Sequence, residues 1–130
     1  MENKLRFVVH EHIRSGHPRH WDLMLEQSPC VPSTEYNATL ETFRLPCPAA
    51  ELRKNTIIIT KIMDHPIRFL SYEGAVNNGE GNVKIIARGE YEKLSEDAGH
   101  MMLSFHGDNL SGKYQLEYSE GDCWKLTSIN

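Results

Sequence analysis

Hydrophobic and polar residues alternate most clearly between His20 and Glu26. Trp21, Leu23 and Leu25 recur at every second position, and a period of two is typical of a half-buried strand. We expect these three side chains to face the core. The opposite face is then expected to be exposed, and it carries His20, Asp22, Met24 and Glu26.

A second strand is predicted just before this one, at residues 5–12, which are rich in β-branched and aromatic residues. The same period of two places His10 and His12 on one face of that strand. Residues 13–19, which join the two predicted strands, contain a glycine and a proline and are therefore expected to form a loop.

Short strand-like stretches recur along the rest of the chain. They are predicted at residues 38–45, 55–63, 67–72, 83–87, 89–94, 101–106, 113–118 and 123–127. Loops are predicted at 27–37 and 73–82, and a short helix at most at 48–54. Many short strands with little helical periodicity predict a mainly β fold, a small closed or partly open antiparallel β-barrel with at most one or two short helices.

Length and composition narrow the class of protein. The 130 residues suit one domain spanning 1–130. Hydrophobic residues at 39% and charged residues at 25% are ordinary for globular proteins and argue against disorder. The longest apolar run is Ile57 to Ile59, far short of the roughly 20 residues of a membrane helix. Without a secretory signal pattern at the start, we expect a cytoplasmic monomer.

Charge and cysteine content exclude further classes. A formal net charge of −4 argues against a protein that coats long nucleic acid, although a local basic patch could still grip a strand end. Three cysteines at wide spacing, Cys30, Cys47 and Cys123, favour reduced thiols over a disulfide framework or a zinc cluster.

A metal site is the chemistry that the first two strands suggest. His20 and Asp22 lie at i and i+2 on one strand face, and His12 comes from the neighbouring strand. Two imidazoles and one carboxylate suit zinc, manganese or iron and leave positions open for water or substrate. The alternative is that these are ordinary side chains on a solvated strand face.

The other histidines are less specific. His10 shares a face with His12, so it either supports the site from behind or is exposed. His17, His100 and His106 are expected to be exposed and not to bind metal. His65 precedes Pro66, which favours an extended conformation. This histidine either acts as a general acid, a general base or a phosphoryl-oxygen donor, or is a turn histidine bonded to the backbone.

Taken together, these segments resemble the 3′-phosphoesterase domain of bacterial DNA ligase D. The matching segments are FVVHEH at 7–12, HWDLMLE at 20–26, DHP at 64–66, YEG at 72–74 and RGEYE at 88–92. Weaker matches follow in the same order, so that the similarity spans nearly the whole chain. The resemblance implies a small β-barrel that uses manganese to remove a terminal ribonucleoside and then the exposed 3′-phosphate.

The resemblance also implies roles for individual residues. The family's metal-binding positions fall on His12, His20 and Asp22, and its additional active-site histidine falls on His65.

Four positions depart from the family pattern. Met24 stands where the family has an arginine, Phe69 where it has a catalytic tyrosine, Cys47 where it has a lysine and Ile57 where it has an arginine. Because methionine cannot replace the planar fork of donors of arginine, phosphate binding is expected to depend on other cations. The candidates are Arg44, Lys61, Arg14 and Arg19.

The leading hypothesis is a metal-dependent phosphoesterase, most simply with Mn²⁺ and otherwise with Zn²⁺ or another transition metal. Its substrate would be a nucleic-acid 3′ end, either DNA or DNA with a 3′-ribonucleotide, and end-joining proteins are expected partners. An alternative is a catalytically impaired relative that binds ends or a repair partner, which an exposed Met24 would favour. A small-molecule phosphoesterase is a third possibility.

Overall fold

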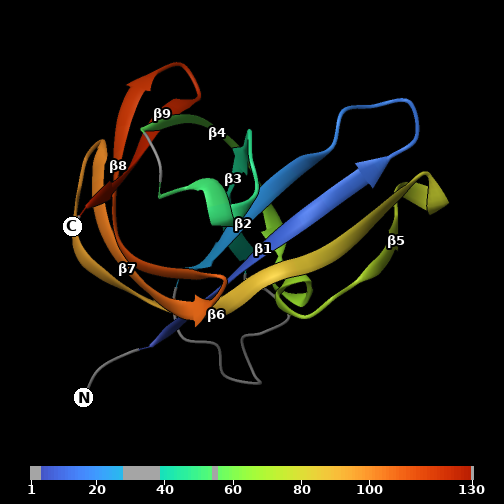
Figure 1. The fold of residues 1–130 in the computed structure, drawn as a ribbon, viewed down its shortest axis with the longest axis horizontal. Coiled ribbons are helices and arrows are strands. Elements are labelled where there is room, and N and C mark those ends of the chain that lie inside the picture. Colours follow the sequence, from blue (N-terminus) through green and yellow to red (C-terminus); the bar gives the residue numbers. More distant parts are fainter. Residues whose placement is uncertain (1–3, 28–38, 54–55, 130) are drawn as a thin grey trace.

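The fold, described here by a computed structural model for residues 4–27, 39–53 and 56–129, is almost entirely β-structure. Antiparallel strands wrap around one core (Figure 1). They are β1 (Leu5–Arg14), β2 (His20–Glu26), β3 (Thr39–Leu45), β4 (Ile57–Pro66), β5 (Gly74–Val76), β6 (Gly81–Asp97), β7 (His100–Asp108), β8 (Leu110–Glu120) and β9 (Cys123–Ile129).

Strand pairing closes this sheet into a ring. The order is β1-β2-β3-β4-β9-β8-β7-β6-β5, and β1 also pairs with β6. The short strand β5 therefore lies outside the ring, attached to β6 only. The predicted mainly β fold with a closed antiparallel sheet is confirmed.

Three 3₁₀ helices of three or four residues interrupt the described part of the chain: η1 (Ala49–Glu51), η2 (Ile67–Leu70) and η3 (Asn77–Gly79). The predicted short helix within 48–54 is confirmed by η1. The strand predicted at 67–72 is wrong, because η2 occupies this segment, and the loop predicted at 73–82 contains β5 and η3. The loop predicted at 27–37 and the thiol of Cys30 lie almost wholly outside the described residues, whereas Cys47 and Cys123 are free thiols.

Two strands that were predicted separately form one strand in the structure, and a glycine within it contacts the neighbouring strand closely. The segments 83–87 and 89–94 belong to the continuous strand β6, which runs through Arg88 and Gly89 without a break. Gly89 lies opposite Gly107 on β7, and a Cβ at Gly89 would lie only 2.4 Å from the Cα of Gly107. It therefore permits a close backbone approach rather than a turn.

The main core fills the inside of the ring. Leu23 and Leu25 are fully buried there together with Phe7, Phe43 and Tyr91, and Trp21 packs against them while partly exposed. The predicted inward face of β2 is confirmed.

The outer face of β2 is also covered, which the alternation did not predict. Met24 is only 2% exposed and packs with Val8, Leu40 and Ile67, the first residue of η2. Glu26 is buried as well, and its Oε2 lies 2.6 Å from Nη2 of Arg6. The prediction of an exposed outer face is therefore wrong for Asp22, Met24 and Glu26. η2 folds back over Met24, and Arg6 pairs with Glu26.

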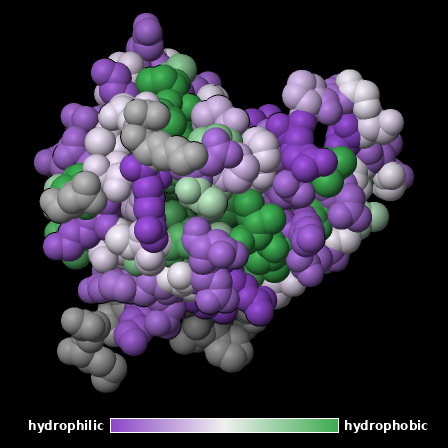
Figure 2. Space-filling view, in the orientation of Figure 1, coloured by the Kyte–Doolittle hydropathy of each residue, from purple (hydrophilic) through white to green (hydrophobic). Residues whose placement is uncertain are grey.

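The distribution of hydrophilic and hydrophobic residues over the surface reflects this arrangement. Hydrophilic residues cover the projecting hairpin of β1 and β2, whereas hydrophobic ones gather over the middle of β1 and β6 (Figure 2). Within the described segments, the helices are all too short to cross a membrane.

Candidate metal and phosphate site

The first two strands bring the three predicted metal ligands together. β1 and β2 pair antiparallel with His12 opposite His20 and with His10 opposite Asp22. Directly opposed residues on an antiparallel pair have neighbouring side chains. His12 therefore meets His20 across the strands, while Asp22 follows His20 along β2 on the same face.

Ligand atoms of these residues converge on one point. Nδ1 of His12 lies 2.9 Å from Nε2 of His20, and that nitrogen lies 3.5 Å from Oδ2 of Asp22. One donor atom from each of His12, His20 and Asp22 falls within 4.8 Å of the other two. Two atoms bound to one transition-metal ion lie roughly 3 to 3.5 Å apart, so this donor set fits a single ion.

Burial keeps both imidazoles in the form that a metal needs. Desolvation lowers the pKa of His12 and of His20 below its ordinary value of 6.5, and the Asp22 carboxylate opposes this only in part. Arg44 adds to the lowering of both pKa values. Neutral imidazole is the metal-binding form.

Arg44 reaches the same carboxylate from the other side. On β3 it lies opposite Asp22, and its Nε donates to Oδ1 of Asp22 at 3.3 Å. The guanidinium is still 44% exposed, so donors remain for an anion.

An open cleft of about 600 Å³ surrounds these groups. It is lined by all three metal-ligand candidates, by Arg44, and by Arg14, His17 and Arg19 of the β1–β2 connection. Arg19 also pairs with Glu11 at 3.5 Å on the exposed surface. Three arginines beside a two-histidine, one-carboxylate set make a site suited to an anionic ester.

His65 lies at the far wall of this cleft, near the end of β4. Its Nδ1 lies 3.0 Å from the carbonyl oxygen of Met63, so Nδ1 donates and Nε2 is left to face other groups. The interpretation of His65 as a histidine bonded to the backbone is confirmed. The same side chain also lines the cleft, and its catalytic role stays a prediction.

Lys61 is not brought to the cleft. Its neighbours Ile62 and Met63 line the cleft, but Lys61 does not. Its Nζ instead donates to Oδ1 of Asp64 at 3.2 Å and to the carbonyl oxygen of Ile62 at 3.1 Å.

His10, whose role the sequence left open, is buried. It is 0% exposed, and neither ring nitrogen makes a hydrogen bond of standard geometry with the described residues. Burial lowers its pKa, while the Asp22 carboxylate raises it. It lines a smaller cavity of about 190 Å³ that adjoins the cleft. The feature of the sequence that pointed to His10 as part of the site was its position on the same strand face as His12.

Met24 and Phe69, two of the departures from the family pattern, line this smaller cavity with His10. The interpretation that an exposed Met24 favours partner binding is wrong, since Met24 is buried. Cys47 and Ile57, the other two departures, are partly buried against the main core.

The remaining histidines are not part of the candidate ligand set. His17 is exposed at the cleft rim, and Nε2 of the exposed His106 donates to Oε1 of Glu92 at 2.9 Å. His100 is half-buried at the start of β7, so the prediction that it is exposed is wrong, and it lies outside the cleft lining.

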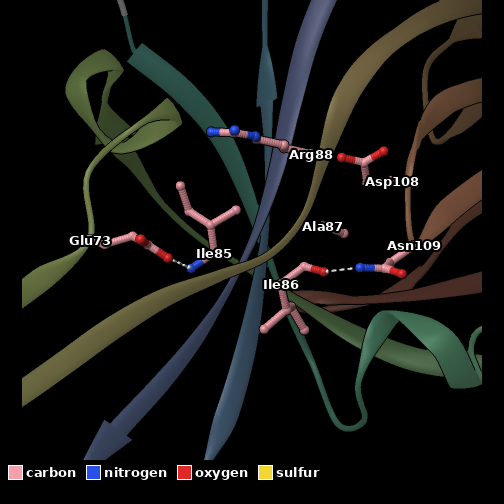
Figure 3. Close-up of a pocket in the computed structure, with 7 residues that line it drawn as sticks. All are labelled: Glu73, Ile85, Ile86, Ala87, Arg88, Asp108 and Asn109. Atoms are coloured by element: carbon pink, nitrogen blue, oxygen red, sulfur yellow. Dashed lines mark hydrogen bonds between the residues drawn. The ribbon is translucent and has the colours of Figure 1, made fainter.

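A separate pocket of about 230 Å³ lies over β6 (Figure 3). A β-bulge interrupts the pairing of β1 with β6 there, so Ile86 has no partner on β1. Oε2 of Glu73 accepts a bond from the Ile85 amide at 2.8 Å, and Nδ2 of Asn109 donates to the Ile86 carbonyl at 2.9 Å. These side chains satisfy backbone groups of the bulge, which is a structural role.

Comparisons with known proteins identify the family. Residues 10–117 match the DNA ligase D 3′-phosphoesterase domain. The chain is 28% identical to the multifunctional non-homologous end joining protein LigD of Mycolicibacterium smegmatis over 94% of its own length. It is 31% identical over 91% of its length to the corresponding DNA repair protein of Mycobacterium tuberculosis.

The chain spans only 16% and 15% of these two relatives, which are much longer proteins. The match nevertheless covers the ligand residues of β1 and β2, Arg44 and His65. By this match over most of its length, the chain belongs to the DNA ligase D 3′-phosphoesterase domain family.

Proposed function

We propose that this protein is a metal-dependent phosphoesterase that acts on 3′ ends of nucleic acid in DNA end repair. It would remove a 3′-ribonucleoside, a 3′-phosphate or both. The observation that carries the proposal is the convergence of His12, His20 and Asp22 in a cleft that three arginines also line.

Each part of the cleft suits one part of a phosphate ester. A divalent cation held by His12, His20 and Asp22, Mn²⁺ first and Zn²⁺ or another transition metal as alternatives, would act as a Lewis acid on a phosphoryl oxygen. Arg44 would hold the charged oxygens, with Arg14 and Arg19 adding positive charge at the rim. Lys61 is left out of this role because its ammonium group bonds to Asp64.

His65 supplies the proton chemistry in this proposal. Because Nδ1 faces the Met63 carbonyl, Nε2 is the atom that would exchange a proton with a substrate oxygen or donate to it. A histidine positioned in this way contributes typically 10²- to 10⁴-fold to rate.

The direct test is a nuclease assay of the purified protein with Mn²⁺. The substrate is a primer-template with a 3′-ribonucleotide or a 3′-phosphate, and the expected result is loss of that terminal group. His20→Ala should abolish it, whereas His106→Ala, which removes an exposed histidine outside the cleft, should not.

Turnover no greater than that of His20→Ala would contradict the proposal. End binding without turnover would then favour the alternative of a non-catalytic end-binding relative. Hydrolysis of small phosphate esters alone would favour the small-molecule alternative.

A further inference from the structure

The smaller cavity beside the metal ligands differs chemically from the main cleft. His12, Asp22 and His65 line both spaces. Beyond them the main cleft is lined by three arginines, whereas the smaller cavity is closed by Met24, Phe69 and Val83. No lysine or arginine is among its described lining residues. An anion is therefore favoured on one side of His12 and Asp22, and a neutral group on the other.

Two further polar side chains, His10 and Asn77, line this cavity beside its apolar residues. His10 lines it, is 0% exposed, and has no hydrogen-bond partner of standard geometry among the described residues. Its ring packs edge-on against Phe69, with centroids 5.9 Å apart. The backbone at Phe69 approaches His10 without the geometry of a standard hydrogen bond. A buried polar group without a well-formed bond is costly, and a hydroxyl can satisfy an imidazole nitrogen as donor or acceptor.

The size of the cavity limits what can enter. Its volume is about 190 Å³, and an apolar cavity of about 150 Å³ holds a benzene-sized ring. A single sugar ring fits this space, whereas a complete nucleoside does not.

We propose that this cavity is a subsite for a sugar ring esterified to the phosphate, and that His10 hydrogen-bonds its 2′-hydroxyl. The inference rests on the proposed function, since the phosphate would occupy the arginine-lined cleft at the same time. The sugar belongs either to the terminal nucleotide or to the one before it. His10 is thus a specificity-determining residue that distinguishes ribose from deoxyribose.

The test compares three otherwise identical DNA strands: all-deoxy, with one ribonucleotide at the 3′ terminus, and with one at the penultimate position. Binding is measured by fluorescence anisotropy in a chelator, so that no turnover occurs. One additional hydrogen bond predicts about 3- to 10-fold tighter binding of one ribonucleotide strand by the wild type. The strand that gains affinity identifies which sugar occupies the cavity.

His10→Leu should remove this preference, so that it binds the three strands with equal affinity, whereas His10→Gln should retain part of the preference. Imidazole resonances of His10 in the wild-type protein provide a second measurement that needs no variant. They should shift with the preferred ribonucleotide strand and not with the all-deoxy strand.

Equal affinity of the wild type for all three strands would overturn the subsite, as would an unchanged preference in His10→Leu. His10 resonances that respond to no strand would also overturn it and would indicate a solvent-filled cavity. Turnover of 3′ ends in the assay above, combined with any of these results, removes the subsite and leaves the proposed function standing. Absence of both binding and turnover removes both.

Discussion

Arg44 donates from Nε to Oδ1 of Asp22 at 3.3 Å, so the cation best placed for a phosphate is attached to a candidate metal ligand. This contact holds the guanidinium at the cleft without using all of its donors. It also means that Arg44 influences the charge balance of the ligand set, because it lowers the pKa values of His12 and His20.

Replacing Arg44 should weaken substrate binding while the fold is retained. The Asp22 side chain is only 4% exposed, so Arg44→Met removes a partner of a buried carboxylate and should lower the free energy of unfolding by about 1 to 3 kcal/mol. A hydrogen bond to a charged group is worth about 1.5 to 3 kcal/mol, so the Kd for DNA with a 3′-phosphate should rise about 10- to 100-fold.

The matched control for this change is Arg53→Met. Arg53 is also an exposed arginine, and it bonds to Ser111 outside the cleft. An equal loss of affinity in both variants would show that only general positive charge matters. Urea unfolding and anisotropy titrations provide the two measurements.

Metal binding should depend on pH in a direction set by burial. The pKa values of His12 and His20 are lowered from 6.5, so both imidazoles remain neutral as the pH falls to that value. Mn²⁺ affinity should therefore be constant above about pH 6.5 and should fall at lower pH as protons compete for the two nitrogens.

Calorimetric titration with Mn²⁺ at a series of pH values checks this expectation. The limiting slope of log K against pH should approach about two, one proton per histidine, and His20→Ala should reduce it. A loss of affinity that begins well above neutral pH would contradict lowered pKa values at these histidines.

A methyl group at Gly81 should damage the site without entering it. A Cβ there would lie 2.8 Å from Nε2 of His12 and 3.2 Å from Cγ2 of Val76. Gly81→Ala should therefore turn the His12 ring, destabilise the fold by about 1 to 3 kcal/mol and weaken Mn²⁺ binding. The exposed neighbour Asn82 offers a control, since Asn82→Ala should leave Mn²⁺ affinity unchanged. Wild-type affinity in Gly81→Ala would rule out this tight approach.

The close pairing of Gly89 with Gly107 should make β6 intolerant of any side chain at that point. A Cβ at Gly89 would clash with backbone atoms at 2.4 and 2.5 Å, which cannot rotate away. Gly89→Ala should lower the free energy of unfolding by about 3 kcal/mol. Gly112→Ala should cost only about 1 kcal/mol, because a Cβ there meets nothing within 4 Å and only the positive φ is strained. Similar losses for the two variants, measured by denaturant unfolding, would contradict this account.

Much of the candidate site could be predicted from short-range pattern. The period of two on β2 correctly separated Leu23 and Leu25 from His20 and Asp22, and the short connection between β1 and β2 is enough to bring His12 beside them. Local alternation and a hairpin-like connection require no knowledge of distant segments.

The environment of Met24 and His10 could not be predicted in this way. Both are buried because η2, more than 40 residues later in the chain, covers the outer face of β1 and β2. A period of two shows that the two faces of a strand differ, but not whether the second face is covered. The role of Gly89 was unpredictable for the same reason, since the glycine there serves the close approach of the partner strand β7.

The sequence by itself therefore determined the β class, the inward face of β2 and the three candidate metal ligands, because strand geometry links neighbouring residues directly. Only the tertiary structure decided that Arg14, Arg19 and Arg44 share the cleft, that Lys61 does not, and that His10 is enclosed in a smaller cavity beside Met24 and Phe69. These outcomes depend on how the ring closes and on what η2 covers. Such long-range contacts do not change the local alternation of hydrophobic and polar residues, so the sequence pattern does not reveal them.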